Sequence, residues 1–185
     1  MDAFEEIVKL LLETKGYWVR QGVEVDISKD DKKTLNNATM PRPEIDLVAF
    51  SPGRGELMLV EVKSYLDSYG VYSDAVCTGK DKLSDRYKLF TDKEFRDLVS
   101  NRLREQLLKD GLILPSTTVR YALAAGHIHS KSDEATIRAH FGDKARDWVL
   151  YTAEDMRATL RDLSDAGWAD NPVIQTAKLL LRETA

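Results

Sequence analysis

Two strongly apolar runs, residues 45–50 and 57–62, follow each other closely and constrain the fold more than any other feature of the chain. The six residues between them, 51–56, read SPGRGE, and Pro-Gly followed by another Gly is typical of a turn. The pattern therefore predicts a β-hairpin. In the second run both alternating sets of side chains are apolar until Glu61, which indicates a strand that is covered on both faces.

Charged side chains end this second strand. Four acid-x-Lys triplets occur in the sequence, but only the one made by Glu61 and Lys63 lies at the end of an apolar strand. A carboxylate buried there is costly unless it is paired or binds a metal. If Ser51 pairs with Glu56 across the turn, Asp46 of the first strand falls directly opposite Glu61, with Cβ atoms about 5 Å apart. Two carboxylates and a lysine held this closely make a hard-oxygen site suited to Mg²⁺, whereas a shift of one residue would move Asp46 to the opposite face.

Periodicity and helix-capping residues predict the remaining elements, and no internal repeat, linker or low-complexity segment divides the chain. In chain order they are a helix over 2–15, a strand over 17–27, an exposed polar loop over 28–42, a helix from the capping box of Thr91 and Glu94 to Asp110, a strand over 117–125, a helix over 133–141, a strand over 148–151, and helices over 152–163 and from Pro172. Residues 64–91 have no clear period, hold four of the seven tyrosines and are compatible with a short helix near Leu83, Tyr87 and Phe90. We therefore expect a single α/β domain over residues 1–185.

The cysteine count, the charge and the apolar runs exclude several classes of protein. Cys77 is the single cysteine, which excludes an internal disulfide framework and a cysteine-based zinc site. His127 and His129 share one face of a strand end, but two histidines without a third ligand do not indicate zinc. The N-terminal residues are acidic and no apolar run approaches 18 residues, so we expect a reduced, soluble, cytoplasmic protein that does not bind membranes. With a net charge of −4, contact with nucleic acid requires a local basic patch.

Residues 43–46 (PEID), the short turn and the triplet Glu61-Val62-Lys63 together resemble the motif of the PD-(D/E)XK nuclease superfamily, which has the restriction-endonuclease-like fold. Residues 4–19 (FEEIVKLLLETKGYWV) look like the first helix of its Holliday-junction-resolvase-like branch. The resemblance covers about residues 3–125 and implies an αβββαβ core with a mixed central sheet flanked by helices. Residues 64–91 are then a Tyr-rich insertion, and residues 126–185 form a C-terminal α/β extension.

The resemblance also implies the chemistry of the site. Asp46 and Glu61 would bind Mg²⁺ or Mn²⁺ directly, with the Val62 carbonyl as a further ligand, and Glu5 would act on the metal through water. Lys63 would orient or deprotonate the attacking water. The implied reaction is in-line hydrolysis of a phosphodiester bond in DNA, with RNA as an alternative substrate, and a homodimer is expected if both strands are cut.

Several of these assignments have an alternative that the residues alone leave open. Asp46, Glu61 and Lys63 can form a salt-bridge cluster at the exposed end of a hairpin. Glu6 competes with Glu5, because acids are favoured in the first turn of a helix whether or not they are catalytic. Glu44 shares a strand face with Asp46 and can either join the site or lie exposed. The same fold can also serve as a non-catalytic module that binds nucleic acid or protein.

A basic segment follows the candidate site. Residues 80–109 hold nine basic and six acidic side chains, a local charge of +3 in a chain of −4, with tyrosines just upstream. Phosphate contact with aromatic stacking is one interpretation, and a solvated helix face is the other. The nucleic-acid contacts predicted in this segment are Lys80, Lys82, Arg86 and Lys88.

Overall fold

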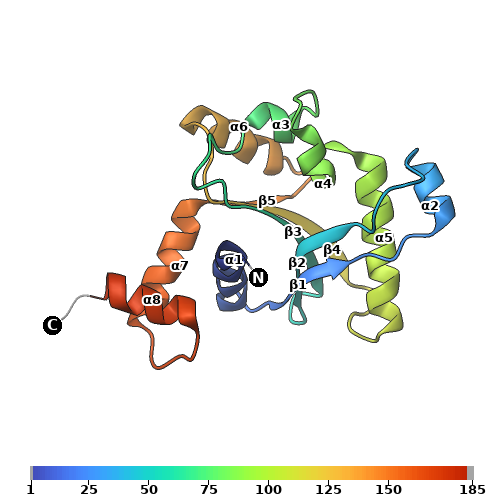
Figure 1. The fold of residues 1–185 in the computed structure, drawn as a ribbon. Coiled ribbons are helices and arrows are strands. Elements are labelled where there is room, and N and C mark those ends of the chain that lie inside the picture. Colours follow the sequence, from blue (N-terminus) through green and yellow to red (C-terminus); the bar gives the residue numbers. More distant parts are fainter. Residues whose placement is uncertain (1, 183–185) are drawn as a thin grey trace.

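A computed structural model of this chain describes residues 2–182 and has one five-stranded mixed sheet with helices on both faces (Figure 1). The strands lie side by side in the order of the sequence and are β1 (Trp18–Glu24), β2 (Glu44–Ser51), β3 (Glu56–Lys63), β4 (Thr118–Ala125) and β5 (Val149–Tyr151). The pairs β1–β2 and β2–β3 are antiparallel, whereas β3–β4 and β4–β5 are parallel. The expected α/β class with a mixed central sheet is confirmed.

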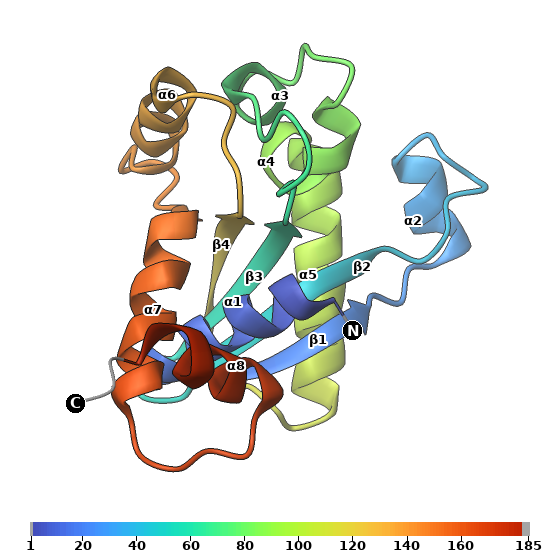
Figure 2. The ribbon, with the colours of Figure 1, turned by 60° about the vertical axis from the view of Figure 1, so that its left-hand side comes forward.

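The helices form two groups that cover opposite faces of the sheet (Figure 2). One face is covered by α1 (Ala3–Thr14) and α7 (Ala153–Asp165), and α8 (Pro172–Leu181) packs against these two helices. The other face carries α3 (Ser73–Cys77), the 3-10 helix η1 (Ser84–Tyr87), α4 (Lys88–Thr91), α5 (Lys93–Lys109) and α6 (Lys131–Phe141), with α2 (Lys29–Thr34) beyond α5 at the edge. Among residues 2–182, no helix combines the length and the apolar composition that a bilayer crossing requires.

The central strand β3 is apolar on both faces, as the sequence predicts. Leu57 and Leu59 pack into the core under α5, while Met58 and Val60 pack into the core under α1. Each of these four side chains is at most 1% exposed. Since burying one aliphatic side chain contributes roughly 1.5–3 kcal/mol, the hairpin that carries β3 is the centre of the fold.

The predicted register of the hairpin is confirmed from Ser51–Glu56 to Leu47–Val60, but the ladder ends before the predicted Asp46–Glu61 pair. The neighbouring ladder between β1 and β2 skips Gly22, whose φ of +58° is one that glycine adopts without steric cost. On β2, Leu47 packs on the α1 side of the sheet, whereas Ile45 packs on the α5 side. A regular strand would keep both side chains on one face, so the ribbon twists between them, where Asp46 lies.

The predicted exposed loop at residues 28–42 is wrong in its first part, because α2 begins there. Ser28 caps this helix: its hydroxyl accepts a hydrogen bond from the Asp31 N–H (3.0 Å), and the Asp31 carboxylate accepts one from the Ser28 N–H (2.8 Å). Arg102 of α5 donates to the same carboxylate from Nε (3.0 Å) and Nη2 (2.8 Å). The hydrogen bonds from Arg102 hold the pKa of Asp31 well below its usual range. This short helix therefore depends on a contact with a distant part of the chain.

Two predicted helix starts shift by one or two residues. Asp92, rather than Thr91, caps α5, since its carboxylate accepts a hydrogen bond from the Phe95 N–H at 2.9 Å. The Thr91 hydroxyl donates instead to two carbonyls of the preceding turns. α6 begins at residue 131, two residues earlier than predicted, because Ser130 caps it. The short helix expected near the end of residues 64–91 is present as η1 and α4.

Gly126, which follows β4, provides a test of the packing at the end of β3. A Cβ atom at this position would lie 2.4 Å from the Ser64 carbonyl oxygen and 2.8 Å from a ring carbon of Phe4. We expect Gly126→Ala to lower the free energy of unfolding by about 1–3 kcal/mol in urea titrations, because overpacking forces the backbone to move. Gly53→Ala is the matched control, since nothing lies within 4 Å of the added methyl group. Equal stability of the two variants would contradict the packing described for Gly126.

Candidate functional site

The end of the β2–β3 hairpin brings together Asp46, Glu61 and Lys63. The Asp46 carboxylate accepts a hydrogen bond through Oδ2 from the Val62 N–H at 2.6 Å. The Lys63 ammonium donates a hydrogen bond to Glu61 Oε1 and forms an ion pair with that carboxylate. The side chains of Lys63 and Glu61 are only 19% and 16% exposed. The two side chains are therefore largely desolvated, unlike an ordinary surface salt bridge.

Burial and neighbouring charges set the protonation of this cluster. The pKa of Glu61 is raised to about 7, because burial and the negative charge of Asp46 outweigh the opposing effect of Lys63. Burial lowers the pKa of Lys63, but the Glu61 and Asp46 carboxylates raise it by more, so the net shift is upward. Lys63 is consequently an ammonium at neutral pH, where the neighbouring Glu61 carboxyl group is partly protonated.

Of the two acids in the first turn of α1, Glu5 is the one whose pKa is affected by the cluster. Its pKa is raised by burial and by the negative charge of Asp46. The Glu6 carboxylate is engaged elsewhere: it accepts a hydrogen bond from Asn171 Nδ2 at 3.0 Å and pairs with Lys9 at 3.3 Å. Glu6 therefore anchors α1 to the start of α8, and Glu5 is the acid whose pKa responds to the charge of Asp46.

One oxygen of each carboxylate in the cluster has no hydrogen bond in the described part of the chain. Within residues 2–182, no hydrogen bond reaches Asp46 Oδ1 or Glu61 Oε2, since the bonds described above use the other oxygen of each carboxylate. In the same part of the chain, no three side chains among His, Cys, Asp and Glu are gathered closely enough to hold an ion. Mg²⁺ commonly takes one or two protein carboxylates and completes its shell with water and substrate phosphate. The cluster offers two such oxygens, not the closed cage of a structural metal site.

Two tyrosines that the sequence did not single out border the cluster. Tyr65 has a positive φ of 45°, and its hydroxyl accepts a hydrogen bond from Arg86 Nη1 at 3.3 Å. Tyr87 is 1% exposed, and its pKa is raised by burial, by its proximity to Tyr65 and by the charge of Glu61. The abundance of tyrosine in residues 64–91 was the available signal, but it did not indicate which ring reaches the site.

The predicted nucleic-acid contacts are not all at the cluster. Arg86 is tied to it through Tyr65. Lys80 and Lys82 are exposed in the turn between α3 and η1, and Lys88 pairs with Asp85 at 3.7 Å. Arg86 is thus the one of the four that hydrogen-bonds to a residue close to Lys63 in sequence.

The chain was compared with known proteins at three levels. No family model, no curated protein and no solved structure matches it. Its function is therefore inferred from the chemistry of the cluster, which lies at the carboxyl end of β3 beside the parallel strand β4. Ligands of open α/β sheets commonly bind at this end of the strands.

The pKa of Glu61 tests the geometry of the cluster. The carboxyl group is expected to titrate near pH 7 in carbon-13 NMR spectra of labelled, metal-free protein. Asp46→Asn should lower this pKa because it removes a nearby negative charge, and Lys63→Met should raise it because it removes the compensating ammonium. Titration near the ordinary value of 4.5 in all three proteins would mean that Glu61 is neither buried nor close to Asp46.

The same pKa makes stability depend on pH. Because the pKa of Glu61 is above 4.5 in the folded chain, its contribution to stability is complete below about pH 4.5 and is lost as the pH rises through about 7. The Gln side chain of the Glu61→Gln variant cannot ionise. The free energy of unfolding of this variant, taken relative to that of the wild type, should therefore be larger at about pH 8 than at about pH 5. Urea titrations at the two pH values measure this difference, and a constant difference would contradict the shift.

Proposed function

We propose that this chain is a Mg²⁺-dependent nuclease of the PD-(D/E)XK type that hydrolyses phosphodiester bonds of DNA. The element order α1-β1-β2-β3-α5-β4 supports this fold once the short helices are set aside. The observation that carries the proposal is the largely buried Glu61–Lys63 pair at the end of β3, with Asp46 beside it and one oxygen of each carboxylate free.

The residues of the cluster have distinct roles in this proposal. Asp46 and Glu61 would hold the metal through their free oxygens, with the Val62 carbonyl as a further ligand. Bound Mg²⁺ would lower the pKa of a water ligand and neutralise charge on the phosphoryl oxygens. Glu61 must be ionised to act as a ligand, and its pKa of about 7 makes metal affinity rise with pH in this range. Glu5 would act through water, a role supported by its electrostatic contact with Asp46.

Lys63 has a narrower role than the family resemblance implies. In the metal-free cluster its pKa is raised, so the ammonium does not accept a proton from the attacking water at neutral pH. The ammonium can donate a hydrogen bond to that water or to a phosphate oxygen. Lys63 would therefore position the nucleophile and stabilise negative charge in the transition state.

The segment that follows β3 supports contact with a nucleic-acid strand. Tyr69 is 79% exposed, and an exposed aromatic ring offers a surface on which a base can stack. His127 and His129 contact two carbonyls of this segment through Nδ1, at 2.9 and 3.1 Å, and so hold it beside the end of β4. Arg86, exposed next to Tyr65, supplies a cation for the phosphate backbone.

DNA cleavage tests the proposal directly. Purified protein with Mg²⁺ is expected to cut plasmid or branched DNA, and chelation of the metal is expected to stop the reaction. Asp46→Asn and Lys63→Met should each reduce the rate by about 100-fold or more, as removal of a group that acts in the transition state commonly does. Lys33→Met is the matched control, because Lys33 belongs to another acid-x-Lys triplet and is 73% exposed.

A non-catalytic binding module is the second interpretation of the same fold. Two observations favour it: the net charge of −4, and the lack of a three-acid metal group within residues 2–182. If folded protein neither cleaves DNA nor binds Mn²⁺ in calorimetry, the nuclease proposal is wrong and the module is preferred. Equal cleavage by the Lys63→Met variant and the Lys33→Met control would remove Lys63 from the mechanism.

A further inference from the structure

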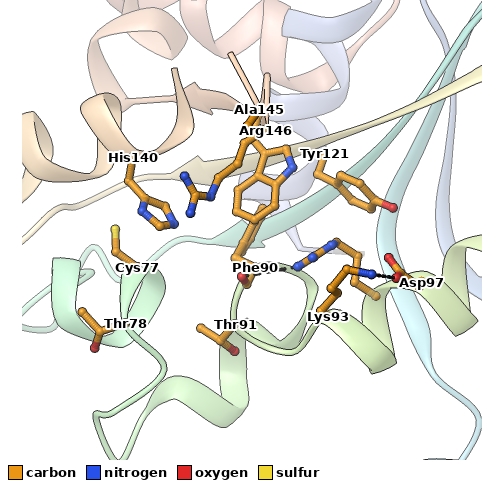
Figure 3. Close-up of a pocket in the computed structure, with 12 residues that line it drawn as sticks. Cys77, Thr78, Phe90, Thr91, Lys93, Asp97, Tyr121, His140, Ala145 and Arg146 are labelled. Atoms are coloured by element: carbon orange, nitrogen blue, oxygen red, sulfur yellow. Dashed lines mark hydrogen bonds and ion pairs between the residues drawn. The ribbon is translucent and has the colours of Figure 1, made fainter. Parts of the chain in front are cut away.

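Away from the carboxylate cluster, a cavity of about 400 Å³ lies between β4 and the helices that cover the α5 side of the sheet. Tyr121 of β4 forms part of its wall, and Tyr121 pairs with Leu59 of β3. Because Leu59 and Glu61 are two residues apart in one strand, the cavity opens on the sheet face that carries Glu61. Figure 3 shows His140 and Arg146 facing Thr91 and Lys93 across this cavity.

Three basic side chains line the cavity. Lys93 and Arg96 come from the first turn of α5, and Arg146 comes from the segment before β5. Asp97 is the one carboxylate in the lining, and it pairs with Lys93. Arg146 pairs with Asp143 just outside the lining, so Arg96 is the one of these three cations that has no ion pair in the described part of the chain.

Arg96 is fixed in place but leaves one edge of its guanidinium available. Nη1 donates hydrogen bonds to the carbonyls of Leu89 and Phe90, at 3.1 and 3.4 Å. The guanidinium also stacks over Trp148, with 5.0 Å between its central carbon and the ring centroid. In the described part of the chain, Nε and Nη2 of Arg96 have no hydrogen-bond partner, and no ion pair neutralises this side chain.

Arg146 approaches the same indole ring. Its central guanidinium carbon lies 5.8 Å from the Trp148 centroid, and its Nη1 pairs with Asp143 at 2.9 Å. Within residues 2–182, Nε and Nη2 of Arg146 likewise have no partner. The pKa of His140 is lowered by burial and by the Arg146 charge, so this ring is a neutral hydrogen-bonding group in the wall. Two guanidinium groups thus approach one ring, and within residues 2–182 only that of Arg146 has a carboxylate partner.

We propose that this cavity binds a phosphate monoester, with Arg96 and Arg146 as its ligands. A guanidinium edge formed by Nε and Nη2 matches two phosphate oxygens, and both arginines present such an edge. A phosphate monoester has three acceptor oxygens for these two edges, whereas a carboxylate or an internal phosphodiester has only two. The monoester belongs either to a free nucleotide or to the phosphorylated end of a nucleic-acid strand.

Binding of phosphates to metal-free protein tests this proposal independently of nuclease activity. Calorimetric titration is expected to show saturable binding of a nucleoside 5′-monophosphate or of a 5′-phosphorylated oligonucleotide, and weaker binding of the same oligonucleotide without its phosphate. Arg146→Gln should weaken the binding at least tenfold. Arg138→Gln is the matched control: Arg138 is a surface arginine of α6 that pairs with Glu134 and lies outside the cavity lining.

The comparison of ligands identifies the source of the phosphate. Equal affinity for nucleotide and oligonucleotide indicates a free nucleotide, whereas much tighter binding of the oligonucleotide indicates a strand end. No saturable binding of either, or an equal loss of affinity in the Arg146→Gln and Arg138→Gln variants, would overturn the proposal. DNA cleavage without this binding would overturn only the phosphate-site proposal. Phosphate binding without cleavage would overturn only the nuclease proposal.

Cys77 provides a second measurement that needs no arginine variant. Its thiol is part of the cavity lining, and it is the single cysteine of the chain (Figure 3). Burial raises the pKa of this thiol to about 11, so alkylation is expected to be slow and sensitive to access. Saturating nucleoside monophosphate should slow alkylation of Cys77 several-fold, while the matching nucleoside should not. Equal alkylation rates with the two compounds would contradict binding in this cavity.

Discussion

The register of the β2–β3 hairpin, set where Ser51 pairs with Glu56, is the constraint on which both the core and the candidate site depend. In this register Leu59 enters one core and Val60 enters the other, while Asp46 meets the Val62 N–H. A slip of one residue would move every side chain of a strand to the opposite face. The burial of several aliphatic side chains, each contributing roughly 1.5–3 kcal/mol, therefore also holds together two carboxylates that repel each other.

The hairpin was predictable because the residues that determine it are close together in the sequence. The turn and both apolar alternations lie within residues 45–62, and no distant contact is needed to interpret them. α2 was not predictable in this way, although Ser28 and Asp31 have the spacing of a capping box, because a helix of six residues is marginal by itself. Its stability depends on Arg102, which is 71 positions away from Asp31 in the sequence.

The same distinction applies to the candidate site. Residue type and strand position identified Asp46, Glu61 and Lys63, but helix position alone could not separate Glu5 from Glu6. The contact of Glu6 with Asn171, from near the other end of the chain, distinguishes them. The protonation of Lys63 was also beyond the sequence, because it reflects a balance between burial and two carboxylates that exists only in the folded chain.

The Glu61 cluster and the Arg96 cavity have a common physical origin. In each, folding has brought like charges close together: Asp46 and Glu61 lie beside the one Lys63 ammonium, and the guanidinium groups of Arg96 and Arg146, of which only the second pairs with a carboxylate, approach the Trp148 ring. The mean field of a chain with a net charge of −4 does not attract a polyanion, so these local charges must provide the affinity. Under the two proposals, a divalent cation would bind the carboxylates and a phosphate would bind the free edges of the arginines. A phosphorylated substrate accompanied by its metal ion would then satisfy both sites on one face of the sheet.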